Sequence, residues 1–433
     1  MRAAIEGLPR LVPDAEVTAA VLLGGGEKLA GPLELGVPVV DGPTAHDALA
    51  AGLARFAPEL VFDLSDEPVV DARSRLRLAA QALLAGVAYQ GADFRLDPPP
   101  RPRVATKPTV AVIGTGKRTG KTAVSAQLAR ALALDGRPPV VVAMGRGGPP
   151  QPELIDPHRF DLSAAGLVAL AASGRHAASD HLEDALMAGV VTIGTRRCGG
   201  GLAGAPVDST FAAGVELANG RPEHLLLLEG SGAAVPPVHA DATVCVVPAT
   251  ADPELVAGYL GAYRLLLADL VVVTMAEDEL DAGRVRESIR GVAPTVDVVQ
   301  TVLRPFPLEP ITGRRVFYVT TAPSSAGDVL TAHLEQRHGA KVLGTSHNLA
   351  RRPQLADDLG GMHGADIMLV ELKAAGVDMA ARVALERGMD VVFCDNRVVT
   401  TASGDGGETF EGLVLKTATG AEKRFAEASR VRQ

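Results

Sequence analysis

The sequence contains no tryptophan, and aromatic residues make up only 3% of its 433 positions. Its three cysteines, Cys198, Cys245 and Cys394, lie far apart, with no CxxC pair and no histidine at metal-ligand spacing. Neither a disulfide framework nor a zinc site is indicated, so a reducing cytoplasm is the expected location. No apolar run approaches the roughly 20 residues that span a bilayer, and we therefore expect no membrane partner.

Basic residues are outnumbered, because 42 Lys and Arg stand against 51 Asp and Glu, and the net charge is −9. This balance argues against a nonspecific nucleic-acid-binding protein and requires any anionic ligand to be held in a local basic pocket. Apolar residues make up 47% of the chain. A chain of this length and composition can bury a large core and should divide into two or three domains.

Prolines and arginines cluster at residues 98–103, where they cannot continue a helix or a central strand. This linker predicts an N-terminal α/β domain over residues 1–103. Helical stretches are expected at Ala45–Phe56 and Ala72–Leu84. The short apolar segments expected between them are residues 16–23, 37–40, 59–64 and 88–89. The chain opens in a helical pattern although such a layer usually begins with a strand, so a segment is expected to be missing from its start.

Residues 104–310 alternate between short β-branched runs and helical patterns. This alternation predicts an α/β fold with a doubly wound parallel sheet. Its expected strands are residues 109–113, 139–144, 190–193, 225–228, 243–247 and 270–274. Residues 311–433 are predicted to form a further α/β domain. The expected strands of that domain are residues 316–320, 341–344, 367–371 and 391–394.

Residues 114–122 read GTGKRTGKT and lie between the first of these central strands and a predicted helix. Backbone amides and a helix N-terminus can surround phosphate oxygens there. The GK[ST] ending predicts that Lys121 reaches the β- and γ-phosphates and that the Thr122 hydroxyl joins a magnesium shell. Thr115 stands where the common GxxxxGK[ST] form has glycine. The expected nucleotide-binding residues are Gly114, Gly116, Lys117, Arg118, Thr119, Gly120, Lys121, Thr122 and Ala123.

Acidic residues follow two other elements. Glu229 ends the strand over residues 225–228, where a magnesium ion beside a phosphate loop needs an oxygen ligand. Asp180 is a candidate second magnesium ligand, or else the N-cap of the helix that follows it. His181, next to it, is expected to be a surface residue. These positions predict a Mg²⁺ site built around Thr122 and Glu229.

Arginines among glycines follow two further strands, at Arg146 in MGRGGP and at Arg197 in TRRCGGGLAG. Arginine offers a bidentate fork to phosphate, and glycines let backbone amides approach an anion. Both residues are therefore candidates to hold a multiply charged anion, with solvated loop charge as the alternative. Glu371 and residues 395–397 also end strands, but solvent exposure or local capping is favoured there over contact with substrate.

The GTGKRTGKT loop resembles those of dethiobiotin synthetase and its relatives in the SIMIBI class. Together with MGRGGP, TRRCGGGLAG and LEGSGAAVPP, over nearly the whole chain, it resembles the cyclic 2,3-diphosphoglycerate synthetase family. The resemblance implies ATP-dependent closure of 2,3-diphosphoglycerate to its cyclic phosphoanhydride, with release of ADP and phosphate. It also implies a cytoplasmic homo-oligomer, a dimer. The absence of a guanine-reading NKxD string agrees with ATP.

On this reading, Lys117 and Lys121 stabilise the transferring phosphoryl group, while Arg146 and Arg197 hold the two phosphates of the substrate. One alternative is a dethiobiotin synthetase-like ligase or kinase that acts on another anionic metabolite. A second is a SIMIBI nucleotide switch without a small-molecule substrate. The flanking α/β regions favour an enzyme with a crevice between domains, and the lack of a His- or Cys-rich tract disfavours metal delivery.

Overall fold

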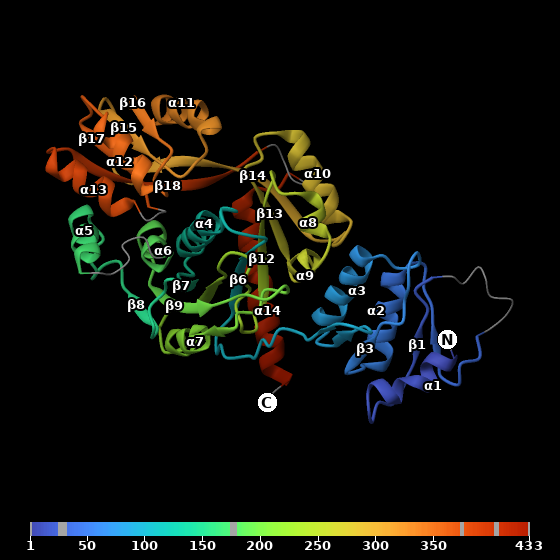
Figure 1. Cartoon of the computed structure of the whole chain (residues 1–433). Coiled ribbons are helices and arrows are strands. Elements are labelled where there is room, and N and C mark those ends of the chain that lie inside the picture. Colours follow the sequence, from blue (N-terminus) through green and yellow to red (C-terminus); the bar gives the residue numbers. More distant parts are fainter. Residues whose placement is uncertain (1, 25–32, 174–179, 373–375, 402–406, 432–433) are drawn as a thin grey trace.

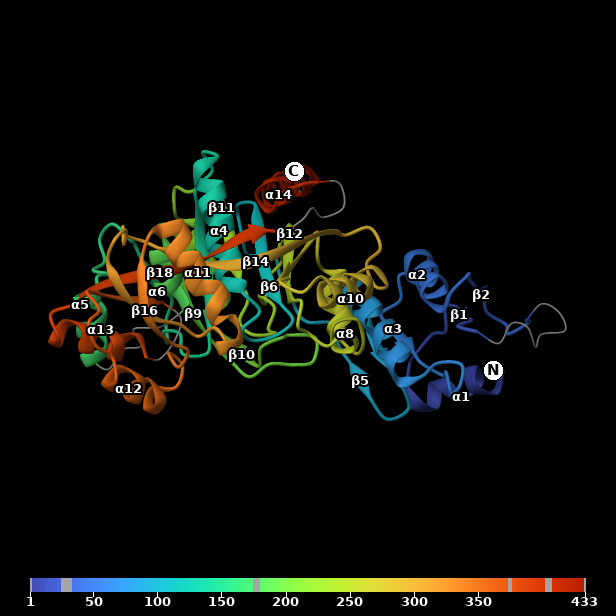
Figure 2. The same ribbon diagram turned by 90° about the horizontal axis from the view of Figure 1, so that it is seen from above.

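The computed structural model describes residues 2–24, 33–173, 180–372, 376–401 and 407–431. In Figure 1 an N-terminal region in blue and a C-terminal region in orange lie at opposite ends, with the central region between them. Figure 2 shows from above that the N-terminal region projects away from the rest of the molecule. None of the described helices is both long enough and apolar enough to cross a membrane.

The N-terminal region is a small α/β layer. Its elements are α1 (Arg2–Leu11), β1 (Ala20–Val21), β2 (Val39–Val40), α2 (Ala45–Phe56), β3 (Leu60–Phe62), α3 (Ala72–Leu84), β4 (Ala88–Gln90) and β5 (Arg95–Leu96). Helices α2 and α3 begin as predicted because side chains cap them: Thr44 accepts a hydrogen bond from the Asp47 amide, and Asp71 accepts one from the Ser74 amide. The strands pair over only two or three residues, so β1, β2 and β3 are shorter than the apolar segments suggested, whereas β4 covers the predicted residues 88–89 and one more.

The central region contains the phosphate loop between β6 and α4. Its elements are β6 (Thr109–Gly114), α4 (Lys121–Leu134), β7 (Pro139–Gly145), β8 (Glu153–Ile155), α5 (Ala164–Ala172), α6 (Asp180–Ala188), β9 (Thr192–Cys198), β10 (Asp208–Ser209), α7 (Phe211–Asn219), β11 (Leu225–Glu229), β12 (Ala242–Pro248), α8 (Pro253–Ala257), α9 (Gly261–Leu266), β13 (Leu270–Thr274), α10 (Glu279–Arg290) and β14 (Asp297–Pro307).

The C-terminal region begins after β14. Its elements are β15 (Arg315–Val319), a 3-10 turn (Ser324–Ala326), α11 (Gly327–His338), β16 (Lys341–Ser346), α12 (Arg352–Gly360), β17 (Ile367–Glu371), α13 (Val377–Glu386), β18 (Asp390–Thr400) and α14 (Phe410–Val431). The last helix returns to the central region, where it packs against β6, β12 and α4. The sequence-based prediction did not include α14 or β14.

One sheet runs through the central and C-terminal regions, in the order β10-β9-β7-β11-β6-β12-β13-β14-β18-β17-β15-β16. The strands from β9 to β14 are parallel, and helices cover both faces. The predicted α/β class with a doubly wound parallel sheet is therefore confirmed. The antiparallel pair of β14 and β18 joins the two regions, and the domain boundaries at residues 103 and 310 stay a prediction.

The carboxyl ends of the parallel strands meet at one edge of the sheet. Glu229 at the end of β11 pairs in register with Val112 in β6 and Ala143 in β7, and β7 ends two residues later, immediately before Arg146. Ligands of open parallel sheets bind at this edge because the loops after the strands converge there. The phosphate loop, the Arg146 loop and Glu229 consequently surround one place.

Candidate active site

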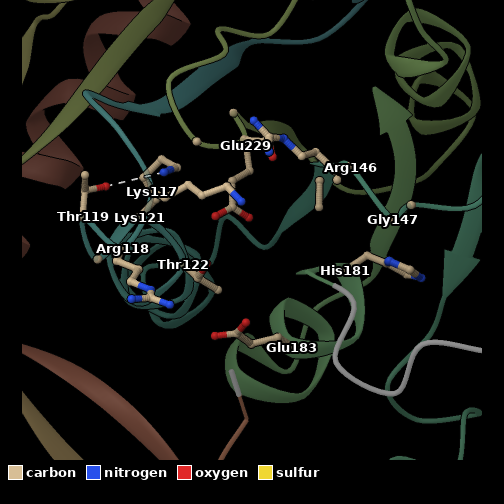
Figure 3. Close-up of a pocket in the computed structure, with 17 residues that line it drawn as sticks. Lys117, Arg118, Thr119, Lys121, Thr122, Arg146, Gly147, His181, Glu183 and Glu229 are labelled. Carbon is tan, nitrogen blue, oxygen red and sulfur yellow. Dashed lines mark hydrogen bonds between the residues drawn. The ribbon is translucent and has the colours of Figure 1, made fainter. Parts of the chain in front are cut away.

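A cavity of about 440 Å³ opens at this edge of the sheet. In Figure 3, residues of the phosphate loop and α4 lie on one side of it, residues of α6 on the other, and Arg146 and Glu229 above them. The cavity is lined by Lys117, Arg118, Thr119, Gly120, Lys121, Thr122, Ala143, Gly145, Arg146, Gly147, Gly148, His181, Glu183, Glu229, Gly230, Ser231 and Gly232.

The phosphate loop has a backbone that only certain residues accept. A Cβ on Gly114 would lie 2.9 Å from Cδ of Lys121, so the strand end must be glycine for the lysine to fold back over it. Gly120 caps α4 with a φ of 88°, and Arg118 adopts a φ of 59°, in the left-handed region that non-glycine residues rarely occupy. The Thr274 hydroxyl of β13 donates to the Thr119 carbonyl at 2.7 Å and anchors the loop to the sheet.

Lys121 and Thr122 are the first two residues of α4, and both are buried against the loop. The ammonium group of Lys121 donates to the Gly116 carbonyl at 2.8 Å. Lys117 and Arg118, by contrast, are exposed at the mouth of the cavity. The helix N-terminus, its partial positive charge and the cationic side chains thus face the same space, which is the arrangement that binds a chain of phosphates.

Two carboxylates line the cavity. Glu229 is 3% exposed at the end of β11, where the sequence predicted a magnesium ligand. Glu183 of α6 is also buried and turns its carboxylate into the cavity, and the sequence analysis did not single it out. Asp180 is the first residue of α6, but its side chain lies outside the described part of the structure.

His181 is not a surface residue, and the expectation that it would be was wrong. It is 5% exposed, lines the cavity and lies with Nε2 3.7 Å from a carboxylate oxygen of Glu153. Its ring packs on Gly194 in β9, where any side chain would collide with it. The sequence held no signal for this burial, because it results from the packing of α6 against β7, β9 and α4.

The two predicted anion-binding arginines differ in position. Arg146 is exposed at the cavity, next to Gly148, whose α-carbon is so close to the Thr195 carbonyl that no side chain fits. Arg197 is 4% exposed and donates to the carbonyls of Gly199 at 2.5 Å and Ser231 at 2.9 Å. Arg197 therefore braces the loop that follows Glu229, which differs from the direct contact with substrate that the sequence suggested.

The strand lengths explain this difference. The sequence predicted a strand over residues 190–193 with Arg197 in the loop beyond it, whereas β9 continues to Cys198. It continues because β8 pairs with its first half and β10 with its end, so that Arg197 lies opposite Ser209. Arg196 points to the other face and donates from Nε to the Gly148 carbonyl at 2.7 Å, which braces the Arg146 loop.

Glu371 ends β17, whereas Asp395 lies inside β18, which continues to Thr400 beyond the predicted strand end; neither residue lines the cavity. The expectation of solvent exposure was wrong for both, since they are 3% and 1% exposed. Glu371 accepts hydrogen bonds from the hydroxyls of Thr320 and Thr321 at 2.8 and 2.9 Å and from the Asn396 amide group. Local hydrogen bonding, the other alternative, is what the structure shows for Glu371.

The metal-binding side chains at this site suit magnesium better than a metal ion whose ligands all come from the protein. Among the described residues, no three His, Cys, Asp or Glu side chains form a metal-binding group. Magnesium usually takes one or two carboxylates, a hydroxyl, water and phosphate oxygens of a nucleotide. The Thr122 hydroxyl and the carboxylates of Glu229 and Glu183 supply oxygens of this kind beside the phosphate loop.

The parallel sheet, the loop between β6 and α4 and the acidic end of β11 define a P-loop nucleoside triphosphate-binding protein. Family models of cyclic 2,3-diphosphoglycerate synthetase match residues 1–97, 109–302 and 307–397, as its N-terminal, P-loop and C-terminal domains. This chain belongs to the cyclic 2,3-diphosphoglycerate synthetase family.

Relatives that carry this name agree with the assignment. The chain is 46% identical to the Rubrobacter xylanophilus protein over 411 residues, which cover 94% of this chain and 91% of the relative. It is 48% identical to the Thermococcus gammatolerans protein over 395 residues, 88% of each chain, and 42% identical to the Methanothermus fervidus protein over 396 residues, 88% of this chain and 86% of that one. LpxK from Aquifex aeolicus, solved with ATP, shares 12% identity at a TM-score of 0.41 over 73% of this chain and 90% of LpxK, too little to support an argument.

Proposed function

We propose that this protein is an ATP-dependent synthetase that closes 2,3-diphosphoglycerate to cyclic 2,3-diphosphoglycerate and releases ADP and phosphate. The observation that carries the proposal is a single cavity that joins a phosphate loop to a separate arginine-bearing loop. A triphosphate and a second anion can therefore meet in one cavity. We further propose that the enzyme acts in the cytoplasm as a homo-oligomer, a dimer, with no nucleic-acid partner.

Closing the ring joins two phosphates of one molecule, which is uphill unless the γ-phosphoryl group of ATP is first transferred to one of them, with release of ADP. An oxygen of the other substrate phosphate then attacks the phosphorus of the phosphorylated one, and the transferred group leaves as inorganic phosphate. Phosphoryl transfer requires mainly positioning and charge stabilisation. Lys121, on the first turn of α4, and Lys117, at the cavity mouth, are the groups proposed to stabilise the transferring phosphoryl. No general base is required by this chemistry.

Thr122, Glu229 and Glu183 are the residues proposed to hold magnesium, and Asp180 remains the alternative to Glu183. Magnesium there would neutralise charge on the nucleotide phosphates. The position of both carboxylates at the cavity beside the phosphate loop supports the choice, because magnesium bound to a nucleotide takes carboxylate oxygens as ligands.

Arg146 is the residue proposed to hold the substrate directly, together with the backbone amides of Gly147 and Gly148. Its exposure within the cavity supports this role. Arg197 is proposed to act on the substrate site through the Ser231 carbonyl rather than through its own contact. The two arginines thus divide between binding the anion and shaping the loop around it.

Phosphate release from ATP and Mg²⁺ tests the function, measured with and without 2,3-diphosphoglycerate while phosphorus NMR follows the organic product. We expect the substrate to stimulate release and a cyclic phosphoanhydride signal to appear. The Lys121→Met variant is the control and should lower turnover by about 100-fold or more. Unstimulated release without a new phosphorus signal would rule out this substrate.

A further inference from the structure

Arg130 lies on α4 at the point where α4, α6 and β18 meet. It is nine residues beyond Lys121, which places it about 13 Å along the helix from the phosphate loop, and it does not line the cavity. Its Nη1 donates to the Met187 carbonyl at 2.7 Å and lies 2.8 Å from Oδ2 of Asp395. One side chain of the nucleotide-binding helix therefore contacts two other elements.

The Met187 carbonyl that Arg130 contacts lies at the end of α6. The last carbonyls of a helix lack partners within it, and a cation there also complements the helix dipole. The same helix carries Glu183 and His181 into the cavity from its first turns. Arg130 consequently ties the far end of α6 to the helix that begins with Lys121 and Thr122.

The contact with Asp395 comes from the C-terminal region. The Asp395 side chain is 2% exposed, and Arg397 approaches its Oδ2 to 3.9 Å. Burial raises the pKa of the Asp395 carboxyl, although Arg130 and Arg397 both act to lower it. A buried carboxylate is costly without a cation beside it, so Asp395 depends on Arg130. The same ion pair restricts where the guanidinium group of Arg130 can lie.

Both terminal nitrogens of the Arg130 guanidinium group have partners. Its Nη2 donates to Oε1 of Gln127 at 2.7 Å, and Gln127 in turn donates to Glu411 of α14 at 3.0 Å. A planar fork with partners in three directions has one orientation, which a lysine ammonium could not reproduce. Arg130 is therefore held in place rather than free to follow α6.

We propose that Arg130 is a positioning residue that sets α6, and with it Glu183, relative to the phosphate loop, and that Asp395 holds Arg130 in this position. The C-terminal region would thus act on the site without touching substrate. The inference rests on the proposed function only where turnover is measured, because the placement of α6 can be followed without any substrate.

The test compares Arg130→Met with the double variant Arg130→Met/Asp395→Leu, which removes the buried carboxylate along with its partner. In Arg130→Met we expect kcat to fall about 10-fold through misplacement of Glu183, with the Kd for ATP and Mg²⁺ within about two-fold because the phosphate loop is intact. Amide hydrogen exchange over residues 181–188 should accelerate about 10-fold as the end of α6 loosens.

The double variant separates positioning from general stability, because replacing a buried ion pair with apolar groups often restores stability. We expect it to recover the melting temperature but neither kcat nor the slow exchange of α6. Recovery of kcat and exchange together with the melting temperature would show a purely structural pair and overturn the proposal. Unchanged α6 exchange in Arg130→Met would overturn it as well, whatever the substrate proves to be.

Two further variants complete the experiment. Asp395→Asn should accelerate α6 exchange by a smaller factor than Arg130→Met, and unchanged exchange would remove Asp395 from the proposal. Arg137→Met is the matched control, because Arg137 follows α4 and pairs with Glu422 of α14 at 3.1 Å without reaching α6. It should lower the melting temperature but leave α6 exchange and kcat within about two-fold of the parent; faster α6 exchange in it would overturn the specific role of Arg130.

Discussion

The loop after β7 and the end of β9 look alike in sequence, since each places arginine among glycines beyond a buried strand. In the structure their arginines have opposite surroundings: Arg146 is exposed at the cavity, and Arg197 is buried behind the Ser231 loop. The difference comes from where each strand ends. β7 stops at Gly145, whereas antiparallel neighbours extend β9 past Arg197. The chemical role of a motif arginine thus depends on strand pairing that lies outside the motif.

The difference between the two arginines can be tested by removing each charge in turn, beginning with Arg146→Met. We expect kcat/KM for 2,3-diphosphoglycerate to fall about 100-fold, since a charge-assisted contact with phosphate is lost. The free energy of unfolding should change by less than about 0.5 kcal/mol because the side chain is exposed. Steady-state kinetics and urea unfolding measure the two quantities. A loss of stability that matched the loss of activity would place Arg146 in the same class as Arg197.

The proposed choice of Glu183 over Asp180 as a magnesium ligand can be tested on α6. Glu183→Gln should raise the magnesium concentration needed for half-maximal turnover by about 10-fold, because an anionic oxygen is lost from the proposed site. Asp180→Asn should change it by less than about two-fold, because Glu183 is the proposed ligand from this helix. Magnesium titrations of turnover decide between them. The reverse result would make Asp180 the ligand, as the sequence alone suggested.

Arg197→Met tests the buried member of the pair. The Gly199 and Ser231 carbonyls would lose a charged donor, so the free energy of unfolding should fall by about 2–3 kcal/mol. We expect kcat to fall about 10-fold as the loop after Glu229 shifts, with KM for 2,3-diphosphoglycerate within about two-fold. Chemical denaturation with initial-rate kinetics checks this. A raised KM at unchanged stability would restore Arg197 as a direct ligand of the substrate.

The smallest expected effect belongs to Arg196, which braces the Arg146 loop from the other face of β9. Arg196→Met removes the 2.7 Å hydrogen bond to the Gly148 carbonyl. We expect a loss of about 1 kcal/mol in the free energy of unfolding and a two- to three-fold rise in KM for 2,3-diphosphoglycerate. An effect as large as that of Arg146→Met would mean that the brace, rather than the exposed charge, governs substrate binding.

Much of the fold could be predicted from local patterns. The helices over Ala45–Phe56 and Ala72–Leu84 have side-chain caps and clear periodicity, and the central strands are short buried apolar runs. β14 was not among the predicted strands, and Pro305 and Pro307 are unfavourable residues within a strand. It forms because β13 pairs in parallel with its first residues and β18 pairs in antiparallel register with the rest, and local sequence reveals neither partner.

The residues of the candidate site also fall into those that local sequence predicts and those that it does not. Lys121, Thr122 and Glu229 follow from a loop and a strand end whose geometry is local, and all three line the cavity. Glu183 and His181 belong to a helix with no motif, and only the packing of α6 beside α4 brings them to the phosphate loop. The sequence of α6 has no periodicity that indicates which of its faces meets that loop.

The class of fold, the phosphate loop and the acidic strand end could be predicted from the sequence, because each depends on residues close together in the chain. The family also follows from the sequence, because it depends on long stretches of shared identity. The tertiary structure is what places Arg146 at the cavity and Arg197 behind it, brings Glu183 of α6 into the cavity, and connects the C-terminal region to α4 through Arg130 and Asp395. These outcomes depend on strand pairing and helix packing between segments far apart in the chain, where the energies of burial and pairing are summed over the whole fold.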